Sequence, residues 1–214
     1  MKKLLFVVLA ALLLAHPGKS AAQVQRPRLV VGLVVDQMRW DYLYYYYDQY
    51  RTDGLRRLLD QGYSCQNTLI NYLPAVTAVG HSSIYTGSVP AFTGIVSNNF
   101  YINGRPTYCV SDSTVTPVGT TADEGRMSPR NLLATGIGDM LKMATDGRSK
   151  VIGISLKDRA AILPAGFAAD GAYWWGKKAG HFVTSTYYRN DLPEWVKRVN
   201  REVQVKSGTN VFTS

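Results

Sequence analysis

Two segments with the pattern of buried strands are rich in β-branched residues and leucine, Arg28 to Val35 and Lys150 to Leu156. β-Branched and leucine residues in an unbroken run are typical of a parallel strand buried on both faces. Shorter runs from Ser64 to Tyr72 and from Ile95 to Ile102 also favour strands, and Asn103-Gly104 after the latter is a hairpin signal. Beyond Tyr173 the pattern predicts strand, turn and strand.

Helices are expected between these strands. Residues 54–62 predict a short helix that ends at Gly62, and Thr77 to Thr86 predicts another that ends at Gly87. A longer helix is predicted from Pro129 to Asp146, with Ser128 as its cap, and a last one near residues 193–201. Strands that alternate with helices indicate an α/β fold with a mostly parallel sheet sandwiched by helices.

The first 22 residues are expected to be a secretory signal peptide rather than part of the fold. Lys2 and Lys3 precede an apolar run from Leu4 to Ala15, and Ser20 and Ala22 fit a small-residue cleavage site before Gln23. The apolar run is short for a membrane span, although an uncleaved anchor is the alternative. We therefore expect residues 23–214 to form the mature protein, which would be periplasmic or secreted without a stable membrane anchor.

The formal net charge is +9, and about +6 without the first 22 residues. Lysine and arginine are scattered along the chain in runs of no more than two, which favours a solvated surface over a nucleic-acid site. A moderately basic surface also suits small anionic substrates. We therefore expect a small phosphate ester as the partner of this protein, and no nucleic acid.

The chain has two cysteines, Cys65 and Cys109. In an oxidising compartment an isolated pair can form one disulfide, and two free buried thiols are the alternative. Their spacing is not that of a zinc–thiolate site.

Polar residues follow three of the predicted strands. Asp36 ends the first, Thr77 comes soon after the second, and Lys157 with Arg159 follows the strand at 150–156. Each has an ordinary structural explanation as a helix cap or a surface charge. In α/β sheets, however, ligands bind beyond the carboxyl ends of the strands, so their common placement points to a site.

These residues suit phosphoryl transfer. A threonine hydroxyl is a weak nucleophile until a metal or a base activates it, and a helix that begins there directs N–H groups at a phosphate. A carboxylate such as Asp36 can hold a divalent cation. Lys157 and Arg159 can compensate the charge on the phosphoryl oxygens.

Five motifs in order resemble one family. They are VVDQMR around Asp36, PAVTAVGHSSIYTG from 74 to 87, GIVSNNF from 94 to 100, SPRNLLATGIGD from 128 to 139 and KVIGISLKDRAAILPAG from 150 to 166. The chain resembles the phosphate-irrepressible alkaline phosphatases, in the type I phosphodiesterase/nucleotide pyrophosphatase branch of the alkaline phosphatase superfamily, over residues 28–200.

The resemblance implies an alkaline phosphatase-like fold and a phosphomonoesterase that uses zinc. Thr77 would be the nucleophile that becomes phosphorylated and bridges two zinc ions, and Asp36 would be a zinc ligand. Asn98 would bind a phosphoryl oxygen, and Lys157 and Arg159 would contact the phosphoryl group. That basic pair resembles the monoesterase version of the site rather than the diesterase version.

The resemblance also implies zinc ligands that this chain does not supply. Family members are longer, and their remaining Asp and His ligands lie in the C-terminal half. We therefore expect residues 23–214 to be an N-terminal part of such a domain that is inactive alone. The alternatives are a phosphodiesterase or nucleotide pyrophosphatase, and a non-catalytic phosphate-binding fragment.

Overall fold

The computed structural model describes the backbone of residues 27–207 and the side chains of residues 27–203, so the predicted signal peptide lies outside the described residues. The chain divides into two compact units between Val35 and Asp36. In the first unit, residues 27–35 form no helix or strand, and Leu29, Val30 and Val31 are 75–78% exposed. The predicted strand from Arg28 to Val35 is therefore wrong for the described structure. An apolar run forms a strand only when its backbone groups find a partner strand.

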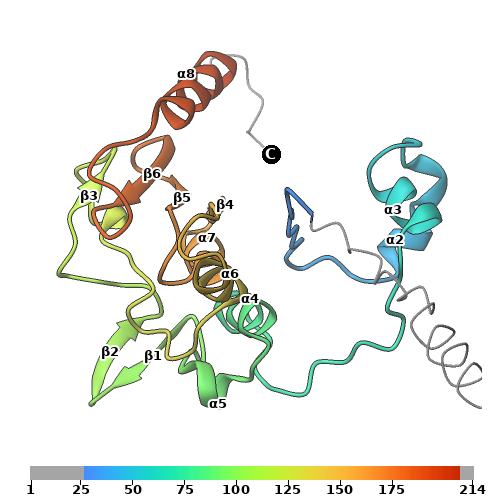
Figure 1. Cartoon of the computed structure of the whole chain (residues 1–214), viewed down its shortest axis with the longest axis horizontal. Coiled ribbons are helices and arrows are strands. Elements are labelled where there is room, and N and C mark those ends of the chain that lie inside the picture. Colours follow the sequence, from blue (N-terminus) through green and yellow to red (C-terminus); the bar gives the residue numbers. More distant parts are fainter. Residues whose placement is uncertain (1–26, 208–214) are drawn as a thin grey trace, which may run out of the picture. The chain divides into compact units, whose positions relative to one another are not determined.

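The second unit contains a four-stranded mixed sheet in the order β3–β6–β5–β4 (Figure 1). Its strands are β3 (Pro117–Val118), β4 (Ile152–Ser155), β5 (Gly171–Gly176) and β6 (His181–Ser185). β4 and β5 are parallel, with Ile154 opposite Tyr173, whereas β5–β6 and β3–β6 are antiparallel. The α/β class is confirmed, and the described sheet is mixed rather than mostly parallel.

Strand β5 shows how helices cover both faces of this sheet. Successive side chains of a strand point to opposite faces. Ala172 and Trp174 belong to a core cluster that includes residues of α7 (Asp158–Ala165) and α4 (Thr77–Thr86). Tyr173, between them, packs in a second cluster with Val196 of α8 (Glu194–Ser207). The prediction of a sheet sandwiched by helices is thus confirmed.

Several local predictions are confirmed. Gly87 ends α4 with φ 64°, in the left-handed region that favours glycine at helix ends. Residues 54–62 contain α3 (Leu55–Gln61). Asn103 and Gly104, both with positive φ, join β1 (Asn99–Ile102) to β2 (Arg105–Tyr108), as a tight hairpin turn requires. The remaining short helices are α2 (Tyr42–Tyr45), η1 (Tyr47–Gln49), α5 (Pro90–Thr93) and η2 (Asp123–Gly125).

Other boundaries differ from the predictions. Residues 64–72 form no strand, and the strand predicted from residue 95 begins only at Asn99. The helix predicted from Pro129 begins at Ile137, as α6 (Ile137–Ala144). β4 was expected to be buried on both faces, yet Ile152 and Ile154 are 49% and 56% exposed.

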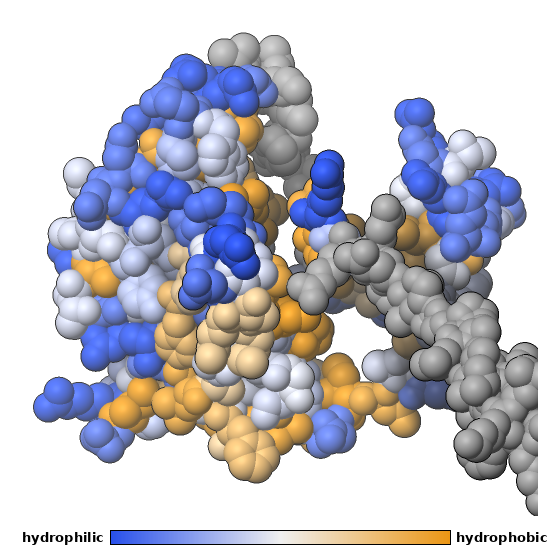
Figure 2. Space-filling view, viewed as in Figure 1, coloured by the Kyte–Doolittle hydropathy of each residue, from blue (hydrophilic) through white to orange (hydrophobic). Residues whose placement is uncertain are grey.

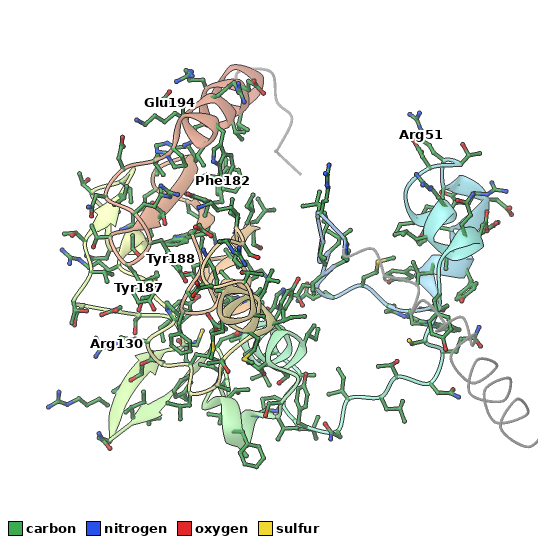
Figure 3. The ribbon with its side chains drawn as sticks, viewed as in Figure 1. Arg51, Arg130, Phe182, Tyr187, Tyr188 and Glu194 are labelled. Carbon is green, nitrogen blue, oxygen red and sulfur yellow. The ribbon has the colours of Figure 1, made fainter. Side chains whose placement is uncertain are left out.

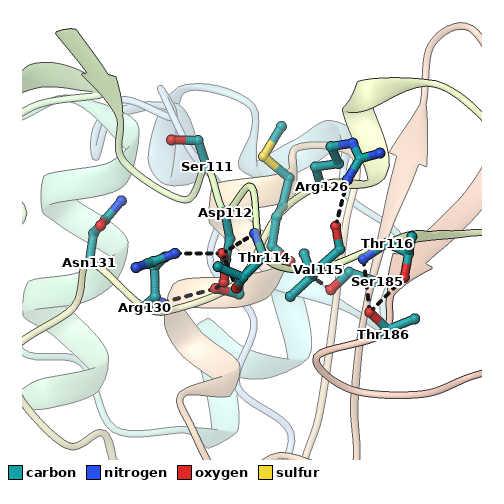
Figure 4. Close-up of polar contacts among 12 residues, drawn as sticks. Ser111, Asp112, Thr114, Val115, Thr116, Arg126, Arg130, Asn131, Ser185 and Thr186 are labelled. Carbon is teal, nitrogen blue, oxygen red and sulfur yellow. Dashed lines mark hydrogen bonds and ion pairs between the residues drawn. The ribbon is translucent and has the colours of Figure 1, made fainter. Parts of the chain in front are cut away.

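Tertiary contacts explain the late start of α6. Ser128 Oγ, the predicted cap, instead donates to Asp112 Oδ2 at 2.6 Å. The same carboxylate accepts from Thr114 and from Arg130 Nη1, at 2.6 and 2.7 Å (Figure 4). The cap of α6 is Gly136, whose N–H donates to Asp139 Oδ2. The polar cluster around Asp112 therefore holds residues 128–130 in a loop.

Both cysteines are free in the structure, Cys65 exposed and Cys109 buried, and no disulfide joins them.

Apolar surface gathers over α4 and α5 in the space-filling view, where Ile84 and Phe92 are 62% and 70% exposed (Figure 2). Within residues 27–207, no helix is both long and apolar enough to cross a membrane.

Candidate active site

Asp36, Thr77 and Lys157 meet directly. Thr77 is the first residue of α4, and its Oγ1 donates a hydrogen bond to Asp36 Oδ2 at 2.9 Å. Lys157 caps α7 two residues after β4 ends, and its Nζ donates to the same carboxylate oxygen at 3.2 Å. Three residues far apart in the sequence are thus brought together, although two of the strands predicted to precede them, at residues 28–35 and 64–72, are not formed.

The contacts of Asp36 favour its charged form. Burial by itself would raise the pKa of this carboxyl group. The hydrogen bonds from Thr77 and Lys157, together with the positive charge of Lys157, outweigh burial and lower the pKa of Asp36 below its usual value of 3.8. Asp36 is therefore a carboxylate at neutral and alkaline pH, as a cation ligand or a hydrogen-bond acceptor for Thr77 must be.

Asn98 reaches the neighbouring position of α4. The Ala78 N–H, one of the N–H groups that have no partner inside the helix, donates to Asn98 Oδ1 at 3.0 Å. Because an N–H group can only donate, the side-chain atom that faces it must be the oxygen. Asn98 Nδ2 makes no hydrogen bond within the described part of the chain and remains a donor. The sequence predicts that N–H groups at the start of this helix face a phosphate. The Ala78 N–H is instead bonded to Asn98, and this bond holds the Asn98 amide in place as a donor.

His81 is buried within α4 and makes a local hydrogen bond there. It is 6% exposed, and its Nδ1 lies 2.8 Å from the Thr77 carbonyl oxygen one helical turn earlier. Since a carbonyl only accepts, Nδ1 carries the proton and donates. This bond lies within α4 and fixes the ring against the backbone of Thr77.

Arg159 does not contact Asp36 or Thr77. Its Nη1 donates to the Tyr108 hydroxyl at 2.8 Å, and that hydroxyl donates to Asp158 Oδ1 at 2.5 Å. Burial first, and then the negative charge of Asp158, raise the pKa of Tyr108 well above 10, so this hydroxyl keeps its proton. The sequence analysis did not identify Tyr108 or Asp158. Asp158 lies between the two predicted basic residues, but nothing in the sequence placed Tyr108, 50 positions earlier, against it.

The site offers two oxygen donors to a metal. Asp36 and Thr77 fit one side of a divalent-cation site, because carboxylate and hydroxyl oxygens suit such ions. They do not complete one, since protein zinc sites have three or four ligands. Among residues 27–207, no group of three or more His, Cys, Asp or Glu side chains is gathered in metal-binding geometry.

The sequence matches the type I phosphodiesterase / nucleotide pyrophosphatase family over residues 30–213, and the chain belongs to that family. It is 52% identical over 213 residues to the alkaline phosphatase PhoV of Synechococcus elongatus, covering 94% of this chain and 39% of PhoV. It is 56% identical over 182 residues to the alkaline phosphatase PafA of Elizabethkingia meningoseptica, covering 84% of this chain and 33% of PafA.

A relative named calcium-transporting ATPase, from Myroides odoratus, is 56% identical over 185 residues, covering 86% of this chain and 34% of that protein. The crystal structure of wild-type PafA superposes with a TM-score of 0.82 at 53% identity, covering 86% of this chain and 36% of PafA. The alkaline phosphatase-like fold is thereby confirmed. The chain spans about a third of the length of the relatives that it matches.

Proposed function

We propose that this chain supplies the nucleophile and the phosphate contacts of an exported, zinc-dependent phosphomonoesterase. The observation that carries the proposal is the shared Asp36 oxygen, which accepts from both the Thr77 hydroxyl and the Lys157 ammonium. Two of the relatives with more than half their residues identical over the matched region are named alkaline phosphatases. The resemblance to a signal peptide at residues 1–22 supports a periplasmic or secreted location, and residues 23–214 are proposed to form part of one alkaline phosphatase-like domain.

In this mechanism Thr77 Oγ1 attacks phosphorus as the ester P–O bond breaks, and the hydroxyl proton ends on the alcohol that leaves. Water later hydrolyses the phosphothreonine, which releases inorganic phosphate and restores the Thr77 hydroxyl. The bond to Asp36 orients the hydroxyl, so that its lone pairs point away from the carboxylate. Lys157, Arg159 and the free Asn98 amide donate to the phosphoryl oxygens, whose charge is spread over all three in the transition state. Zinc, when bound by Asp36 and Thr77 together with further ligands, would lower the pKa of the hydroxyl.

The same four residue types recur in a solved variant of PafA. That structure carries substitutions at a threonine, an asparagine, a lysine and an arginine, and it matches this chain with a TM-score of 0.83 at 52% identity. Thr77, Asn98, Lys157 and Arg159 are the same types in the same order. This agreement supports the proposed roles.

A monoester is the preferred substrate because its phosphoryl group carries more negative charge than that of a diester. Two cationic phosphate contacts, as proposed for Lys157 and Arg159, stabilise the more highly charged group better. The family description also covers phosphodiesterases. We therefore expect Lys157→Ala to weaken binding of a monoester analogue much more than that of a diester analogue. Equal losses would favour the diesterase.

The first test is binding of methylphosphonate, a non-hydrolysable phosphate analogue, by calorimetry. We expect about tenfold weaker binding in Lys157→Ala, and in Arg159→Ala a similar loss. Lys150→Ala is the matched control, because Lys150 pairs with Asp170 instead of Asp36. Binding that is unchanged in both variants would contradict the proposed phosphate contacts.

The second test is hydrolysis of p-nitrophenyl phosphate at alkaline pH with added zinc, with Thr77→Ala as the blank. Because only two zinc ligands are proposed within this chain, we expect no activity above the blank and fewer than two tightly bound zinc ions. Activity that Thr77→Ala abolishes would mean that residues not identified here complete the metal site.

A further inference from the structure

A pocket of about 700 Å³ opens beside Lys157 and Arg159. Both basic residues belong to its lining. The apolar part of the lining is formed by Leu156, Trp174, Trp175, Phe182 and Val203, and Glu124, Asp158 and Lys177 add further charged groups. A volume of this size and a largely aromatic wall with a few charged groups are typical of small-molecule sites.

Trp174 is 1% exposed, so the ring surfaces that the wall presents to a ligand belong to Trp175 and Phe182. Trp174 Nε1 donates to the Glu124 carbonyl oxygen at 2.9 Å. Both Glu124 carboxylate oxygens accept backbone N–H groups, from Lys178 and Ala179. The polar atoms of Trp174 and Glu124 are therefore already satisfied within the protein.

The rings of Trp175 and Phe182 pack against each other. Trp175 on β5 and Phe182 on β6 meet edge to face, with ring centroids 5.5 Å apart and planes at 88° (Figure 3 labels Phe182). Such a pair is held in a favourable aromatic geometry. The pocket therefore offers a fixed aromatic surface instead of flexible polar side chains.

The pocket is continuous with the proposed phosphate contacts. Lys157 lines it and also donates to Asp36, beside the Thr77 hydroxyl. Arg159 lines it too, and its buried Nε has no hydrogen-bond partner within the part of the chain that the structure describes. A phosphoryl group that takes its bonds from these two residues carries its ester substituent into reach of the aromatic wall.

We propose that this pocket binds the alcohol portion of the substrate, and that the preferred substrates are phosphate monoesters whose alcohol carries a planar aromatic ring. Ring faces stack well on a planar aromatic group, whereas the hydroxyls of a sugar or a polyol would lose water where they meet the rings of Trp175 and Phe182. The inference rests on the proposed function, because Lys157 and Arg159 anchor the phosphoryl group in both.

The test compares two non-hydrolysable analogues, benzylphosphonate and methylphosphonate, in calorimetric titrations of the whole chain. Both carry the same phosphonate, so their affinity ratio reports the aromatic group alone. We expect benzylphosphonate to bind about tenfold more tightly. Trp175→Ala should bring the ratio close to one, while Trp175→Phe should keep most of the preference. Phe92→Ala, which removes an exposed ring on α5 outside the pocket, should leave the ratio unchanged.

Each outcome separates the two proposals. Equal affinities for both phosphonates in the unmodified chain would overturn the aromatic preference and leave the proposed function standing. A preference for benzylphosphonate that persists in a folded Trp175→Ala variant would also overturn it. If neither phosphonate binds, the proposed function fails and the inference fails with it. Circular dichroism and the retained preference of Trp175→Phe separate a lost contact from a lost fold.

Discussion

The Thr77 hydroxyl donates a hydrogen bond to Asp36, which lies 41 positions earlier in the chain. This bond, together with the one from Lys157, ties the residue after the first predicted strand to the starts of two helices. The hydroxyl of Thr77 and the ammonium of Lys157 thereby meet at one carboxylate oxygen of Asp36.

The Asp36–Lys157 pair should contribute little to stability. Their side chains are 34% and 42% exposed, and exposed ion pairs are typically worth less than about 1 kcal/mol. A double-mutant cycle with Asp36→Asn and Lys157→Met, measured by urea denaturation, should give a coupling energy below about 1 kcal/mol. A coupling of 3 kcal/mol or more would mean that the pair is a structural device rather than part of a binding site.

Tyr108 should act through Arg159. Tyr108→Phe removes the hydroxyl that joins Arg159 to Asp158, and hydrogen bonds to charged groups contribute about 1.5–3 kcal/mol each. We expect a loss of about 2 kcal/mol in the free energy of unfolding and severalfold weaker binding of methylphosphonate. Tyr101→Phe, whose ring is 74% exposed, should change stability by less than about 0.5 kcal/mol. Lower stability with unchanged affinity would show that Tyr108 does not position Arg159.

Asp112 should make the fold sensitive to acid. Burial alone would raise its pKa, but the hydrogen bonds from Ser128, Thr114 and Arg130 hold the pKa at about 2, against a usual value of 3.8. A lowered pKa in the folded state stabilises the protein above the unfolded value, and that stabilisation is lost as the pH falls from about 4 to about 2.

The corresponding measurement is urea denaturation at pH 5 and pH 3. Asp112→Asn should lower stability at pH 5 and should reduce the decline between the two pH values. Asp170, whose pKa is also about 2, should account for part of the decline that remains. An unaltered decline in Asp112→Asn would contradict the assignment.

The two thiols should differ in reactivity. Burial is the main reason that the pKa of Cys109 rises to about 12, and the nearby Asp158 adds to it. The thiolate is the reactive form, so at pH 8 an aromatic disulfide reagent should modify the exposed Cys65 alone. Denaturation should release the second thiol. If no thiol reacts until a reductant is added, the two cysteines form a disulfide in solution.

Local signals in the sequence predicted those features that depend on a few adjacent residues. Gly87 predicted the end of α4, and Asn103-Gly104 predicted the turn between β1 and β2. The position of Thr77 at the start of α4 follows from a signal of the same kind, whereas α7, which begins after Lys157, was not predicted. These features depend on backbone conformations that neighbouring residues determine, so the sequence alone suffices.

Features that depend on distant partners were not predictable. The helix expected from Pro129 is replaced by a loop because Ser128 bonds to Asp112 and the Leu133 N–H donates to the Thr93 carbonyl oxygen. Tyr108 reaches Arg159 only because β2 lies against the start of α7. Neither contact leaves a periodic signal in the sequence, since its partners are 16 to 51 positions apart.

Strand β4 pairs with β5 on one side, and within residues 27–207 no strand pairs with its other side. Its free edge therefore presents a row of backbone N–H and C=O groups beside the exposed Ile152 and Ile154. Such an edge is a template on which a second polypeptide can add a strand. Edge-to-edge association of this protein should consequently increase with its concentration. A single charge at this edge, as in Ile154→Lys, would be the simplest way to keep the chains apart.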